Sequence, residues 1–343
     1  MAEVTGVRER RLACGMTQAE LAAKAGVSRQ LVAAVEAARH APAVDAALGI
    51  ARALGTTVEE LFSPHRMAVT SALGGPLRPG ALLRVGRVDS KLVAAELPDH
   101  GTLGAVWAKP DAVVEGDRVR LLPAASPAGF VVAGCDPALG VAEAMLTGLG
   151  PSSLLAVSAP SGKALAAMKD GGLHAAVIHG RTGHLPEPPP DVDRWHLAKW
   201  HVGLAFPAKK RTPTLAALLR GPGPLIQQDG AAASQQALLR ASRAAGVKLP
   251  PGPVASSHLD AARRAFTTGG TGVTIEAAAR AFGLGFLPIE EHTVELWVDD
   301  RWVGHPGLAA FGEILTTPAF LQRVELFGGY DLSGCGDRVD QAA

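Results

Sequence analysis

The period of the hydrophobic pattern changes twice along this chain of 343 residues. Apolar residues first recur at helical spacing, then form short β-rich runs between turn residues, and finally form continuous apolar runs that alternate with helical stretches. Because a domain usually has roughly 100 to 200 residues, we expect several domains rather than one core. The predicted architecture is an all-α domain at residues 4–66, a β-rich connector at 74–125 and an α/β domain at 129–338.

Composition narrows the class of protein. Hydrophobic residues make up 48% and charged residues 19%, which predicts globular folding and excludes a disordered chain. The formal net charge of +1 excludes unselective coating of nucleic acid, so any DNA contact must be local. The 3 cysteines form no CxxC pair, which excludes a disulfide framework and a thiolate zinc site. Neither a signal peptide nor a run of about 18 apolar residues occurs, so we expect a cytoplasmic protein without a membrane partner.

The N-terminal region contains the start and stop signals of two short helices. Thr17 and Glu20 have the spacing of a capping box, and Gly26 ends the helix that they begin. Ser28 is placed to cap a second helix immediately afterwards. Two short helices joined by a glycine-containing turn make a helix-turn-helix, whose second helix fits the major groove of DNA.

The run from residue 15 to 62 resembles the phage-repressor-type helix-turn-helix domain of the XRE family of bacterial regulators. The resemblance implies that Gln18 and Ser28 contact phosphates. It also implies that Arg29, Gln30 and the following turn of the second helix contact bases. It also implies that Arg11 and Glu36 bridge the first helix to the recognition helix. The residues that we expect to contact DNA are Gln18, Ser28, Arg29, Gln30, Ala33 and Arg39. Since one such domain makes few contacts, we expect a homodimer on two half-sites of an operator.

Polar residues follow the apolar runs of the C-terminal region. In open α/β sheets, ligands bind beyond the carboxyl ends of strands, where helix N-termini present free amides. These strand ends and the helix starts after them therefore supply the candidate ligand-binding residues. The candidates are Cys135, Asp136, Ser158, Ser161, Gly162, His179, Gln228, Asp229, Ser234, Thr274 and Glu276.

Taken in order, these segments resemble the periplasmic-binding-protein-like domain of cytoplasmic regulators, which is related to molybdate-binding proteins. The resemblance covers residues 129–338 and includes the runs VVAGCDPALG, AAVIHG and VGLAFPAKKRTPTLAALLR. It implies two α/β lobes around a cleft, with chain crossings near residues 200–206 and 285–288. Hinge closure on a bound small molecule is the implied motion.

The loop from Gln228 to Ser234 departs from that family, whose relatives carry a basic loop there. An acid, Asp229, stands where an arginine suited to an oxyanion is expected, and a carboxylate repels a dianion. A neutral or cationic effector therefore fits better than molybdate or tungstate, with Asp136, Asp229 and Glu276 available to an amine. The alternative for Asp136 and Asp229 is a purely local role as helix N-caps, and for Glu276 a favourable first-turn acid.

Enzyme and metal signatures are weak. Histidines are frequent between residues 174 and 201, but neither HExxH nor a His pair at i, i+4 on one helix occurs, so strand-end and loop histidines are the simpler interpretation. Ser161 to Lys163 lacks the remaining residues of a P-loop, and GxSxG is absent. The sequence therefore predicts a ligand-responsive DNA-binding regulator with no metal, no cofactor and no catalytic activity. A molybdate or tungstate sensor and an α/β enzyme with a fused DNA-binding head are the alternatives.

Overall fold

The computed structural model describes residues 7–37, 39–62, 69–97, 110–116, 118–122, 125–147, 150–208 and 211–339. Contacts divide the chain into two compact units. The first contains Met1–Ser71, Pro76–Val85 and Lys91–Pro127, and the second contains Ala72–Gly75, Gly86–Ser90 and Ala128–Ala343. Among the described residues, none of the helices combines the length and apolar character that a membrane span requires.

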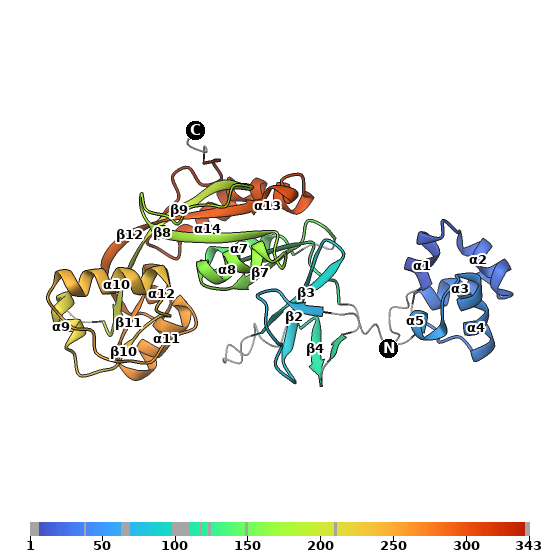
Figure 1. The fold of residues 1–343 in the computed structure, drawn as a ribbon, viewed down its shortest axis with the longest axis horizontal. Helices are drawn as coiled ribbons and strands as arrows, with labels where there is room; N and C mark the ends of the chain where they lie inside the picture. The colour runs from blue at the N-terminus through green and yellow to red at the C-terminus, as the bar shows by residue number, and fades with distance from the viewer. Residues whose placement is uncertain are drawn as a thin grey trace. The chain divides into compact units, whose positions relative to one another are not determined.

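The first unit begins with five short helices, coloured blue in Figure 1. The predicted capping box is confirmed, because the backbone N–H of Glu20 donates to Thr17 Oγ1 while the Glu20 carboxylate accepts from the backbone N–H of Thr17. Gly26 ends this helix with φ 68°, a left-handed conformation that favours glycine. Ser28 Oγ then accepts from the N–H of Leu31 and begins the next helix. The helices are α1 (Val7–Ala13), α2 (Gln18–Ala25), α3 (Arg29–Glu36), α4 (Val44–Ala53) and α5 (Val58–Phe62).

These helices enclose one small apolar core. Leu21 of α2, Val32 and Val35 of α3, and Ile50 of α4 (Val44–Ala53) are fully buried within it. Gly49 allows α4 to approach α2 closely, because a Cβ at this position would lie 2.5 Å from the carbonyl oxygen of Ala25. The core holds α3 with its N-terminal turn exposed.

A five-stranded sheet follows the helices and confirms the predicted β-rich connector. Its strand order is β1-β3-β2-β4-β5, with β4 antiparallel to both β2 and β5. Buried side chains of Leu83, Val85, Leu92 and Val114 contribute to its core. The strands are β1 (Val69–Ser71), β2 (Leu82–Val88), β3 (Lys91–Glu96), β4 (Ala112–Glu115) and β5 (Arg118–Leu121).

The second unit contains an eight-stranded sheet that extends through two lobes. The order is β10-β11-β9-β12-β8-β6-β7, and β13 pairs with β9. In the first lobe, β6 is parallel to β7 and β8, and all five residues of β6 are buried, as expected for a continuous apolar strand covered on both faces. The strands of this lobe are β6 (Phe130–Gly134), β7 (Leu154–Ser158), β8 (Ala175–Arg181) and β13 (Tyr330–Asp331). Its helices are α7 (Ala138–Met145), α8 (Ser161–Lys169), α13 (Pro306–Leu315) and α14 (Pro318–Glu325), with a 3-10 turn η1 (Asp300–Trp302).

The second lobe is smaller and is built around two short parallel strands. Figure 1 shows its helices, coloured yellow to orange, around β10 and β11. The elements are α9 (Leu215–Leu219), β10 (Leu225–Ile226), α10 (Ala233–Ala244), α11 (His258–Thr268), β11 (Thr271–Ile275) and α12 (Glu276–Ala281).

Two long antiparallel strands, β9 (Val192–Phe206) and β12 (Gly285–Asp299), belong to both lobes. β12 pairs with β8 from His292 onward, whereas β9 pairs with β11 from Val202 onward. Gly203 is required at this crossing, because a Cβ there would lie 2.2 Å from the carbonyl oxygen of Leu287. The predicted two-lobed α/β fold is therefore confirmed.

Candidate functional site

The exposed face of the helix-turn-helix lies at the start of α3. Ser28, Arg29 and Gln30 are all exposed there, and Arg39 is exposed beyond the end of the helix. Ala33 is half-buried one turn further along α3. The first turn thus offers a guanidinium and an amide to a partner, which are the groups that read guanine and adenine edges in the major groove.

A buried ion pair fixes the orientation of α3. Arg11 Nε lies 2.6 Å from Glu36 Oε1, and the Arg11 guanidinium also donates to the carbonyl oxygen of Met16. Gln18 Nε2 donates to Glu36 Oε2 at 2.8 Å. Burial raises the pKa of Glu36, but hydrogen bonds from Arg11 and Gln18 outweigh it and hold that pKa below its usual value. The predicted bridge between Arg11 and Glu36 is confirmed, whereas the phosphate contact of Gln18 stays a prediction.

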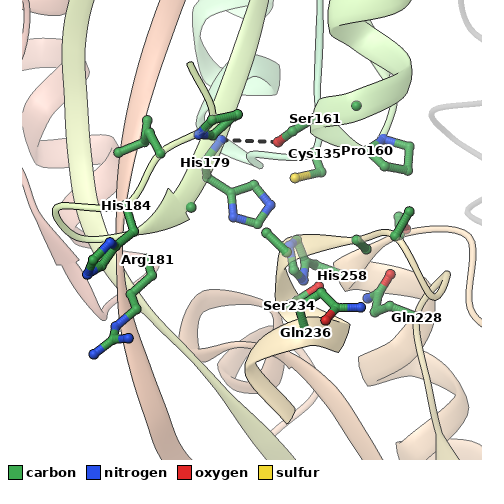
Figure 2. A pocket seen from close by; sticks show the side chains of 18 of the residues that line it. Cys135, Pro160, Ser161, His179, Arg181, His184, Gln228, Ser234, Gln236 and His258 are labelled. Atoms are coloured by element: carbon green, nitrogen blue, oxygen red, sulfur yellow. Dashed lines mark hydrogen bonds between the residues drawn. The ribbon is translucent and has the colours of Figure 1, made fainter. Parts of the chain in front are cut away.

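The second unit contains a cavity of about 570 Å³ between its lobes, shown in Figure 2. The first lobe contributes the N-terminus of α8 and the end of β8, and the second contributes the N-termini of α10 and α11. The N-cap residues of α8 and α10 are Pro160 and Ala232, and neither makes a side-chain cap. The N-cap side chains therefore leave the first-turn backbone amides of both helices uncapped, and such amides attract anions.

Six of the predicted ligand-binding residues line this cavity. They are Cys135, Ser161, Gly162, His179, Gln228 and Ser234. Asp136 and Ser158 instead line a neighbouring cavity of about 810 Å³. Asp229, Thr274 and Glu276 are absent from the lining of both cavities, as far as the described residues show.

Asp136 is occupied by partners within the first lobe. Its carboxylate accepts from the hydroxyl of Tyr330, the indole N–H of Trp200 and the backbone N–H of Ala138. Burial raises the pKa of Asp136 above its ordinary value, against the effect of these hydrogen bonds. These hydrogen bonds connect the β6–α7 turn to β9 and β13. The carboxylate of Asp136 therefore has a structural role.

The other two acids expected to meet an amine also have local partners. The carboxylate of Asp229, an exposed residue, accepts from the N–H of Ala231, and Glu276 forms an ion pair with Arg280 one turn along α12. Among the described residues that line the cavity there is no Asp or Glu, while Arg181 and Arg240 are present. Asp229, the acid that together with a missing arginine counted against an anionic effector, lies outside this lining.

A chain of polar groups leads from an ion pair to the cavity wall. Arg240 of α10 donates two hydrogen bonds to Glu290, and Glu290 Oε1 lies 2.9 Å from His292 Nε2. His292 Nδ1 in turn lies 2.9 Å from His179 Nδ1. Burial lowers the pKa of both His179 and His292, so both rings are neutral at neutral pH.

Sequence reasoning missed several lining residues. Arg181, Gln236 and His258 were not predicted. His258 is the first residue of α11, whose N-cap is Ser257, so the start signal SSHLD was readable but its position in the cleft was not. Potential ligand atoms of Cys135, His179 and His258 all lie within 4.8 Å of one another. The spacing of these residues in the sequence resembles no metal motif. The exclusion of a thiolate zinc site from the cysteine pattern concerned paired cysteines, so it does not cover a group of one cysteine and two histidines.

Comparisons with known families fit this architecture. The model of the helix-turn-helix family matches residues 7–61, and the model of the PBP superfamily domain matches residues 142–316, more than half of the chain. The chain belongs to the PBP superfamily. In this PBP-superfamily chain, the N-terminal domain is a DNA-binding helix-turn-helix of the XRE type. The two predicted resemblances are thereby confirmed, and this combination of domains is that of a transcriptional regulator.

Two curated relatives match a short part of this chain. An uncharacterized HTH-type transcriptional regulator of Methanothermobacter thermautotrophicus is 46% identical over 59 residues, which are 17% of this chain and 86% of that protein. A protein with the same description from Archaeoglobus fulgidus is 41% identical over 58 residues, 17% of this chain and 83% of that protein.

Solved structures resemble the PBP-superfamily part at low sequence identity. A mutant of Corynebacterium glutamicum OxyR is 16% identical with a TM-score of 0.43, and the match covers 59% of this chain and 66% of that one. The regulatory domain of HypT from Salmonella typhimurium is 12% identical with a TM-score of 0.43, covering 55% of this chain and 92% of that one. This chain therefore spans just under two thirds of the length of the OxyR structure.

Proposed function

We propose that the protein is a ligand-responsive transcriptional regulator, in which a small molecule in the cleft of the PBP-superfamily domain changes operator binding by the helix-turn-helix. The observation that carries this proposal is the cavity of about 570 Å³, into which helix N-termini of both lobes open. A ligand that contacts both lobes stabilises their closed arrangement, so its binding is linked to a conformational change. The regulator would act in the cytoplasm, where its operator DNA is found.

DNA recognition is assigned to the exposed start of α3. Arg29 and Gln30 would contact base edges, Ser28 and Gln18 the phosphates, and Ala33 and Arg39 the adjoining backbone or bases. We assign these contacts to a homodimer, because two recognition helices on two half-sites supply the affinity that one short helix lacks. The proposed domain bounds are 4–66 for the helix-turn-helix domain, 74–125 for the β-rich connector and 129–338 for the ligand-binding domain.

The lining of the cavity favours an effector with an anionic or neutral polar group over an amine. First-turn amides of α8 and α10 and the guanidinium of Arg181 are positive, while Gln228 and Ser234 offer neutral hydrogen bonds. These groups also support the second candidate, a molybdate or tungstate sensor, because two uncapped helix N-termini at one cavity suit an oxyanion.

A thermal-shift screen of the full chain tests the cleft as an effector site. The panel contains molybdate, carboxylates, amines, nucleosides, sugars and Zn²⁺. A ligand at one hundred times its dissociation constant should stabilise the domain by about 2.7 kcal/mol, which is roughly 5 to 11 °C for a domain of about 200 residues. Ala231→Trp, at an exposed position in the lining, should abolish the shift by filling the cavity.

The matched control is Ala309→Trp, which adds the same side chain at an exposed position on α13 outside both cavities. This control should retain the full shift. An equal shift in wild type and Ala231→Trp would place the effector elsewhere and contradict the proposal.

A further inference from the structure

Three potential metal ligands converge at the cavity from distant parts of the sequence. Cys135 follows β6 and His179 lies on β8, both in the first lobe, whereas His258 begins α11 in the second lobe. Their candidate ligand atoms lie within 4.8 Å of one another, and all three residues line the cavity. Figure 2 shows the rings of His179 and His258 and the sulfur of Cys135 at the same part of the cavity.

The polar chain behind His179 determines which of its nitrogens is free. Glu290 is a carboxylate, because hydrogen bonds from Arg240 and His292 outweigh its burial and lower its pKa. Glu290 therefore accepts a hydrogen bond from the Nε2–H of His292, which leaves the Nδ1 of His292 as the acceptor for the Nδ1–H of His179. His179 then carries its proton on Nδ1 and has a lone pair on Nε2. A carboxylate and a second imidazole that fix the tautomer in this way are typical partners of a metal-binding histidine.

His258 supplies an independent sign of a missing partner. Its Nδ1 is buried and has no hydrogen-bond partner among the described residues, although the residue is only 3% exposed. An unsatisfied buried polar atom destabilises the folded state, so native proteins rarely keep one without a use.

From this geometry we infer that Cys135, His179 and His258 form a binding site for a thiophilic divalent transition-metal ion, with Zn²⁺ as the best match and a fourth position open to the cavity. A soft thiolate with two imidazoles is a donor set that Zn²⁺ accepts, and three protein ligands leave room for water or an effector oxygen. The inference rests on the proposed function, because the metal would occupy the wall of the effector cavity.

Metal binding would draw the lobes together. Zn–S and Zn–N bonds of about 2.3 and 2.0 Å require ligand atoms somewhat closer than 4.8 Å, and His258 lies in the opposite lobe from the other two ligands. On binding, the metal–sulfur bond replaces the S–H bond of Cys135, and the proton is released to solvent. The metal thus couples its own binding to closure of the cleft.

Cobalt titration of the full chain tests the site directly. The protein is prepared reduced and without a histidine tag, and Co²⁺ is added while absorption is recorded, since a cobalt–thiolate bond gives a charge-transfer band in the near ultraviolet. Wild type should show this band with tetrahedral d–d absorption, and Zn²⁺ should abolish both. Cys135→Ser should remove the charge-transfer band, and His258→Gln should weaken Co²⁺ binding at least tenfold.

Two controls separate this site from other donors. Cys14→Ser removes an exposed cysteine, and His201→Gln removes an exposed histidine outside the cavity lining, so both should keep the wild-type spectrum. Wild-type hydrogen-exchange protection of β6, β8 and α11 in metal-free Cys135→Ser and His258→Gln shows that these variants are folded. A charge-transfer band that persists in Cys135→Ser, or its absence from wild type, overturns the metal site.

Failure of the metal inference and failure of the proposed function give different results. Suppose that wild type lacks the cobalt spectrum while another compound gives a thermal shift that Ala231→Trp removes. This result contradicts the metal site and supports the effector cleft. If Zn²⁺ binds through Cys135 but leaves operator affinity unchanged, the metal site stands, and control of DNA binding by the cleft is contradicted.

Discussion

Glu36→Ala should destabilise the helix-turn-helix domain by about 3–5 kcal/mol, because it leaves the Arg11 guanidinium buried without its counter-charge. The side chains of Arg11 and Glu36 are only 9% and 4% exposed, and Gln18 loses its acceptor as well. A loss of this size is a large fraction of the stability of a small domain. Hydrogen exchange of the full chain should therefore show unprotected amides across α2, α3 and α4, while the C-terminal lobes keep their protection.

The double variant Arg11→Met/Glu36→Leu separates the ion pair from simple loss of packing. Removing both charges leaves no uncompensated buried charge, although Gln18 and the Met16 carbonyl lose a partner, so most of the protection should return. If Glu36→Ala alone keeps wild-type protection in α3, the ion pair does not hold the recognition helix in place.

Gln30→Ala should weaken operator binding by about 2–6 kcal/mol in a dimer, because a bidentate base contact is worth about 1–3 kcal/mol and each dimer would lose two. Gln30 is exposed in the first turn of α3, so its truncation should leave the fold intact. The measurement is fluorescence anisotropy on an operator selected from random DNA, at one fixed salt concentration, beside a scrambled duplex. Affinity for the scrambled duplex should stay at the wild-type value.

Ser28 provides the contrasting variant, Ser28→Gly, because glycine replaces the N-cap of α3 at a cost of only about a few tenths of a kcal/mol. Its predicted contact is to a phosphate, so binding to operator and scrambled DNA should fall by the same factor. If Gln30→Ala also weakens both duplexes equally, Gln30 does not read a base.

Local signals made the N-terminal fold predictable. Two local features define α2: the capping box of Thr17 and Glu20, and the left-handed turn at Gly26. Both depend only on residues a few positions apart, so they can be predicted from the local sequence. The apolar strand β6 was equally clear, because a strand covered on both faces needs an unbroken apolar run.

The direction of side chains at strand ends was not predictable. Asp136 was expected to face a ligand, but Tyr330, which is 194 residues away, donates to its carboxylate within the lobe. Asp229 satisfies the backbone of its own turn instead. Conversely, His258 reaches the cavity only because the second lobe places the start of α11 against the end of β8, an arrangement that no local pattern encodes.

We propose that occupancy of the cleft changes DNA binding. The direct measurement is the affinity of the full chain for its selected operator, with and without the panel compound that shifts its melting temperature, in wild type and in Ala231→Trp. Coupling between two sites is typically worth 1–3 kcal/mol, so the affinity of wild type should change by about 5- to 150-fold, while that of the variant should not change. An operator affinity that stays the same in wild type when the cleft is saturated would contradict the account.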